Sequence, residues 1–227
     1  MKQLARLHWS TLAVSLVIAA CLLLITALQF LDTVTRLRII REGSYVELSS
    51  AIVWLAACVG YTFVARSDMG QIWHRATLLL LAGLRELDLH VRFTGESIFN
   101  EDTYFHAGIS TGYRIYSILA IALIVTTVIR TVLVDARPLL TNLKRGERLA
   151  RLVACALGLL VVAKTIDGLR GRAEDLAWNL PWALFELAES AEEVLELGAP
   201  IIVTVAVIVA WQQRQQETID QPRTSAS

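Results

Sequence analysis

The chain has 227 residues, of which 55% are hydrophobic and only 19% are charged, and its mean hydropathy is +0.54. Its 21 Lys and Arg residues balance its 21 Asp and Glu residues, which excludes the basic face that a nucleic-acid-binding protein needs. The composition also excludes a disordered chain, and three cysteines that all lie within apolar blocks exclude a disulfide scaffold. The apolar residues form long blocks, which predict a membrane protein.

Three of these blocks are long enough to cross a bilayer without help. A transmembrane helix needs about 20 mostly apolar residues to cross about 30 Å of hydrocarbon. Residues 10–31, 45–65 and 113–134 meet this requirement. The second block carries one carboxylate, Glu47, in its first turn.

Three further blocks are too short by themselves, because their apolar parts cover only 76–84, 149–163 and 199–211. Each is followed or preceded by a charged stretch. If these blocks cross the membrane, the missing turns must come from those charged ends. We therefore expect spans near 74–92, 149–168 and 182–211.

The sequence thus predicts an all-α, polytopic membrane helix bundle of about six transmembrane helices, formed by residues 1–211. Six spans place both termini on one side. The loops on that side hold more Lys and Arg than the opposite loops, which favours cytoplasmic termini in a bacterial inner membrane. Residues 212–227 are predicted to be a disordered cytoplasmic tail, and His74 is expected at the inner interface.

Ionisable residues gather in the outer half of four of these spans. Intramembrane charges are costly, so they usually face the bundle interior or a water-filled cavity and mark function. The residues are Glu47, then Arg85, Glu86, Asp88 and His90, then Lys164 and Asp167, and finally Glu186, Glu189, Glu192, Glu193 and Glu196.

The helical spacing of these residues favours a shared site. Glu86 and His90 are four residues apart, so they project from one face of a helix. Glu186, Glu189, Glu193 and Glu196 follow one another at intervals that form a single stripe.

One interpretation is a metal-dependent hydrolase or transferase that acts on a lipid or lipid-linked substrate. Carboxylates and an imidazole suit a divalent metal such as zinc. The expected ligands are Glu86, His90, Glu189 and Glu193. Glu47, Asp88 or Asp167 would then act as a general base or orient a ligand.

Two other interpretations fit the same residues. The first is a proton- or cation-coupled transporter or channel, with Arg85 and Lys164 as internal counter-ions. The second is a structural or assembly subunit in which Arg85 and Lys164 pair with Glu189, Glu193 or Asp167. Crowding of like carboxylates should leave some of them protonated and neutral. The expected partners are membrane lipids, with a homo-oligomer or a partner membrane protein as further options.

Three segments carry a resemblance to a known family: Glu42 and Gly43 with Glu47, residues 85–94, and residues 192–198. Together they resemble a family of uncharacterised bacterial multispanning membrane proteins. The resemblance covers most of the chain from the second span onward. It implies the multispanning architecture and no particular activity.

A fainter resemblance is to the alkaline ceramidases and related membrane hydrolases, which have seven spans and bind zinc through three histidines. The present chain departs from that pattern, since six spans are expected and no histidine follows His106. The three-histidine site is therefore not carried over.

Overall fold

The computed structural model describes residues 2–40, 43–87, 110–176, 178 and 180–220. In these ranges the chain forms helices joined by short turns, with no strand. The all-α prediction is thereby confirmed. The helices are α1 (Lys2–Leu28), α2 (Thr33–Ile40), α3 (Tyr45–Ala65), α4 (Met69–Glu86), α7 (Thr111–Lys144), α8 (Arg148–Asp167), α9 (Leu169–Asp175) and α10 (Trp182–Asp220).

Five segments of the described chain are long and apolar enough to cross a membrane, which makes this a multi-pass membrane protein. They are Trp9–Leu28, Thr33–Ala65, Thr111–Lys144, Arg148–Asp167 and Trp182–Gln216. Helix α4 is not among them. That residues 74–92 form a sixth span stays a prediction, because residues 88–92 lie outside the described ranges.

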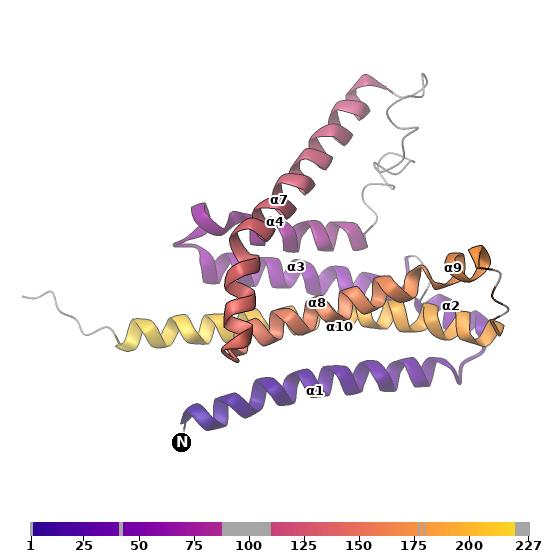
Figure 1. Cartoon of the computed structure of the whole chain (residues 1–227), viewed down its shortest axis with the longest axis horizontal. Coiled ribbons are helices and arrows are strands. Elements are labelled where there is room, and N and C mark those ends of the chain that lie inside the picture. The colour runs from indigo at the N-terminus through magenta and orange to yellow at the C-terminus, as the bar shows by residue number, and fades with distance from the viewer. Residues whose placement is uncertain (1, 41–42, 88–109, 177, 179, 221–227) are drawn as a thin grey trace, which may run out of the picture.

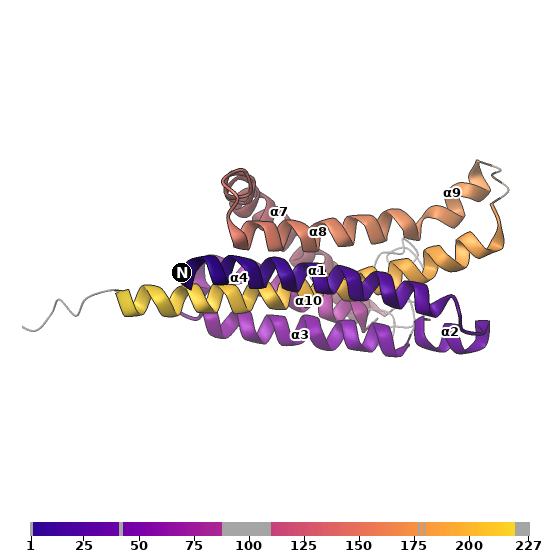
Figure 2. The same ribbon diagram turned by 90° about the horizontal axis from the view of Figure 1, so that it is seen from below.

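Helix α10 lies at the centre of the bundle, with α8, α3 and α1 packed along it (Figures 1 and 2). Half of its most apolar stretch is buried, whereas only 11% of the corresponding stretch of α1 is buried. Helix α1 begins and α10 ends at the same end of the bundle, here named the terminal end. The opposite end, where α3 and α10 begin and α4 and α8 finish, is named the far end.

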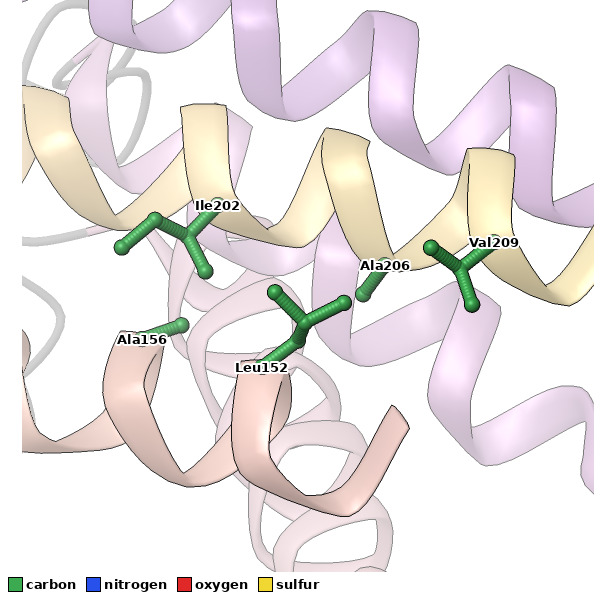
Figure 3. Packing of buried hydrophobic residues seen from close by; sticks show 5 residues of the cluster. All are labelled: Leu152, Ala156, Ile202, Ala206 and Val209. Atoms are coloured by element: carbon green, nitrogen blue, oxygen red, sulfur yellow. The ribbon is translucent and has the colours of Figure 1, made fainter. Parts of the chain in front are cut away.

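The main core is an interface of aliphatic side chains between α8 and α10 (Figure 3). Leu152 and Ala156 of α8 face Ile202, Ala206 and Val209 of α10, and all five are nearly inaccessible to solvent. Alternation of small and branched residues lets two membrane helices approach closely, and dispersion contacts then hold them together.

Two glycines mark further close approaches between helices. A Cβ atom at Gly198 of α10 would lie 2.9 Å from Cys21 Sγ of α1. At Gly83 of α4 a Cβ atom would lie 3.0 Å from the side chain of Leu55 on α3. Small residues at such contacts are typical of helix packing in membranes, where close backbone approach replaces the hydrophobic driving force.

The connection between the first two predicted spans contains a helix, α2. The Asp32 side chain begins it by accepting a hydrogen bond from Thr35 N (2.9 Å). This backbone hydrogen bond holds the pKa of the Asp32 carboxyl below its usual value. Asp and Asn side chains commonly cap helices in this way.

At the other end of the chain, α10 continues to Asp220 and so includes residues 212–220, which were expected to belong to a disordered tail. Gln, Glu and Arg favour helix whether or not an apolar face is present, and Arg214 also donates to Ser67 Oγ (3.0 Å) and pairs with Asp68. Residues 221–227 lie outside the described part of the chain.

Candidate functional site

The far end of the bundle collects charged side chains from three long helices. Helix α4 finishes there with Arg85 and Glu86, α8 finishes there with Lys164 and Asp167, and α10 contributes the glutamates of its first half. The antiparallel course of these helices therefore produces the convergence that the sequence predicts from the alternation of spans (Figure 1).

Glu196 of α10 is the central member of this cluster. Its side chain is only 9% exposed. One carboxylate oxygen, Oε1, lies 3.4 Å from Arg85 Nη2 of α4 and 3.1 Å from Lys164 Nζ of α8. A single buried carboxylate thus links three helices, which is the pairing that a buried charge requires.

The two basic residues extend the network on either side of Glu196. Lys164 Nζ lies 2.9 Å from Asp167 Oδ2 and 3.4 Å from Glu192 Oε1. Arg85 Nη1 lies 3.6 Å from Glu86 Oε1, whose side chain is 7% exposed. Four carboxylates therefore share two cationic side chains, so the cluster carries an excess of acid.

Glu193 differs from its neighbours in the cluster. Its half-buried carboxyl faces the charges of Glu196, Glu192, Glu47 and Glu86. Within the described ranges it forms no ion pair with a basic side chain, in contrast to Glu192 and Glu196.

Glu47 lies at the start of α3 and takes part in a helix cap. Its carboxylate accepts a hydrogen bond from Gly43 N, while its own backbone N–H donates to Ser44 Oγ (3.3 Å). This reciprocal arrangement is close to a capping box. Gly43 has a positive φ of 79°, which glycine adopts without strain. The local role explains the position of Glu47, and its role as a general base stays a prediction.

A separate ion pair at the far end joins the short helix α2 to α10. Arg36 of α2, buried by its surroundings, places Nη2 2.5 Å from Glu186 Oε1 of α10. Glu186, the first glutamate of the predicted stripe, is thereby used to hold α2 against α10.

The predicted metal ligands are only partly placed by the structure. Glu86 is buried beside Arg85, Glu193 is half-buried, and Glu189 is exposed. His90 and Asp88 lie outside the described residues, as does His106. Among the residues that are described, no group of three or more His, Cys, Asp and Glu side chains is suited to hold a metal ion. The zinc hypothesis stays a prediction that depends on His90.

A second polar cluster, which the sequence analysis missed, joins α4 and α7 at the terminal end. His74 is completely buried there, with Nε2 3.0 Å from Asp135 Oδ2, and its Nδ1 accepts from Arg130 Nε (3.3 Å). Because Arg130 can only donate, Nδ1 must be unprotonated and Nε2 carries the hydrogen. Arg75 donates twice to Asp135, at 3.0 and 2.6 Å. Together, His74, Arg75, Arg130 and Asp135 are named the inner clamp.

The sequence held one signal for the inner clamp. Arg130 and Asp135 fall at the end of the fourth predicted span, and His74 and Arg75 fall at the start of the third. Successive spans would bring these four residues to the same membrane face. The ring of His74 is enclosed where α4 packs against α7. That His74 lies at the inner membrane interface stays a prediction.

The chain matches no protein-family model, and comparison with curated proteins and with solved structures likewise gives no match. The two resemblances drawn from the sequence therefore stay predictions, and function has to be argued from the geometry of the far end.

Proposed function

We propose that the chain is a multi-pass protein of the bacterial inner membrane, with cytoplasmic termini, that carries protons through the acidic cluster at its far end. The observation that supports this proposal is the position of Glu193. It faces four other carboxylates, and in the described part of the chain it has no basic partner. Buried acids of this kind mark proton pathways in membrane proteins.

We assign the exchangeable proton to Glu193 because the neighbouring carboxylates are engaged by Arg85 and Lys164. Glu196 is held between Arg85 and Lys164 by two ion pairs. When Glu193 loses its proton, its new charge competes with Glu196 and Glu192 for the same two cations. Proton exchange at Glu193 would therefore loosen or tighten the contacts of α10 with α4 and α8, which couples protonation to helix packing.

A proton suits this cluster better than a metal cation. Arg85 and Lys164 already occupy Glu196 and Glu192, and among the described residues no group of three or more His, Cys, Asp and Glu side chains is placed to hold a metal ion. The metal-dependent hydrolase is the alternative, and it requires His90 as a ligand.

The test is proton uptake by proteoliposomes that hold a pH-sensitive dye and a potassium diffusion potential. We expect uptake by the native protein and its loss in Glu193→Gln, with partial activity in Glu193→Asp. The control is Glu147→Gln, because Glu147 is exposed at the terminal end and makes no side-chain cap. Uptake that persists in Glu193→Gln would refute the proposal.

One more variant separates the two functions. Glu189 is exposed and belongs to the predicted metal ligands but to none of the ion pairs described above. Proton transfer through Glu193 predicts that Glu189→Gln retains uptake. A metal-dependent enzyme predicts that Glu189→Gln and His90→Ala both lose a stoichiometric metal, which elemental analysis of purified protein would detect.

A further inference from the structure

Helix α7 is longer than a membrane span. Its 34 residues extend about 51 Å at about 1.5 Å per residue, against about 30 Å of hydrocarbon. About two fifths of the helix must therefore leave the hydrocarbon, or the helix must tilt strongly. The apolar block ends near Val134, so the part in question is the C-terminal one, residues 132–144.

This C-terminal part turns across the bundle. Figure 1 shows α7 bending and then running across the long helices near the terminal end, and Figure 2 shows this part end-on. Pro138 lies inside the helix and cannot donate to the carbonyl of Val134, which allows a bend. Because α8 and α10 are candidate membrane spans, we expect a segment that runs across them to lie along the membrane plane.

The inner clamp fixes the place of the bend. Asp135 is held by His74 and Arg75, and Arg130 Nη2 donates to Gln71 O (3.1 Å). The backbone of α4 is non-helical at the next residue, Ile72 (φ −119°, ψ 18°). Arg130 and Asp135 of α7 therefore bind the irregular start of α4. These contacts within the chain set the orientation of the C-terminal part of α7.

The segment is amphipathic along its helical axis. At about 100° per residue, six apolar residues share one side, Arg137 and Lys144 border that side next to Leu133 and Leu140, and Arg145 lies opposite. Leu133 and Leu140 on the apolar side are 77% and 59% exposed. The apolar side comprises Val132, Leu133, Ala136, Leu139, Leu140 and Leu143.

Basic residues dominate the polar side and the turn that follows. Arg137, Lys144 and Arg145 are exposed, and Arg151 in the first turn of α8 is exposed as well. The turn itself is closed by Gly146, whose φ is 73°. Between residues 137 and 151 the only acidic residue is Glu147.

We propose that residues 132–145 form an interfacial helix that binds the anionic headgroups of membrane phospholipids. The exposed leucines, Leu133 and Leu140, enter the acyl boundary, and the basic residues beside them contact lipid phosphate. Helices that lie in the interface have this combination of an apolar face and a Lys- and Arg-rich face. The negative charge of the lipid surface complements the excess of basic residues.

The first test measures depth in the membrane. Leu140→Cys and Thr141→Cys are introduced singly into the full chain, reconstituted in vesicles that contain phosphatidylglycerol, and treated with a membrane-impermeant maleimide. We expect Thr141→Cys to react and Leu140→Cys to be protected. Equal reaction at both positions would mean that the segment lies in water or awaits a protein partner, and protection at both would mean that it spans. Either result overturns the proposal.

The second test measures lipid preference. Native mass spectrometry of the full chain counts phosphatidylglycerol and phosphatidylcholine molecules that stay bound. Each basic side chain near an anionic surface contributes roughly fivefold in affinity. Arg137→Gln and Lys144→Gln should therefore each lower phosphatidylglycerol retention by about fivefold. Arg38→Gln, an exposed position at the far end, should not. Equal retention of the two lipids, or an equal effect of Arg38→Gln, would refute the proposal.

Discussion

Replacing Lys164 by Met tests the ion-pair network most stringently. The substitution keeps the apolar stem and removes the ammonium group, which contacts Asp167, Glu192 and Glu196 at 2.9, 3.4 and 3.1 Å. The pair with Asp167 is half-exposed and contributes about 0.4 kcal/mol. The other two carboxylates are largely buried, so each of these pairs contributes about 1 kcal/mol, less than a fully buried pair because Lys164 itself is half-exposed.

The expected loss in the free energy of unfolding is therefore about 2 kcal/mol, which lowers the melting temperature by about 4–8 °C for a chain of this size. Tryptophan fluorescence of the purified protein in detergent during heating measures it. The matched control is Arg38→Met, at the same end of the bundle and exposed, which should change the melting temperature by less than about 2 °C.

A double-mutant cycle isolates the contact with Glu196. Lys164→Met and Glu196→Gln together should destabilise the protein by about 1 kcal/mol less than the sum of the two single effects. Additivity within about 0.3 kcal/mol would show that the two side chains do not interact, and the network that links α4, α8 and α10 would be refuted.

Three further predictions concern packing and the inner clamp. Gly198→Ala should lower the free energy of unfolding by about 1–3 kcal/mol, because its Cβ atom would lie 2.9 Å from Cys21 Sγ. Adding Cys21→Ala to the same chain should restore part of the lost stability. If nothing is restored, the contact between these two residues is contradicted. Leu152→Ala should cost about 2 kcal/mol through lost contacts with α10, as thermal unfolding would show. His74→Ala should cost about 2 kcal/mol by leaving Arg130 Nε without its acceptor, and an unchanged melting temperature would argue against the clamp.

The sequence predicted the far-end gathering of charge because that result depends only on the alternation of spans. Once the short apolar blocks require polar extensions, the ends of α4 and α8 and the start of α10 must meet at one end. The identity of the partners depends on the rotation of each helix about its axis, which tertiary packing sets. For that reason Glu196 is the residue between Arg85 and Lys164, whereas Glu189 points to the exterior.

The inner clamp and the bend of α7 were beyond the sequence analysis for a related reason. His74 and Asp135 are separated by 61 positions, and their contact requires α7 to turn across α4. Apolar length located the fourth span but could not show that its helix continues past Val134 in a different direction. Pro138 and the basic residues after it were the available signal.

The protonation state of Glu193 is the quantity on which the proposed function depends. Infrared spectroscopy of the reconstituted protein resolves the C=O stretch of a protonated carboxyl in an apolar setting. We expect such a band near neutral pH in the native protein, its disappearance in Glu193→Gln, and its persistence in Glu189→Gln. A native spectrum without this band, or a band that survives in Glu193→Gln, would contradict the account.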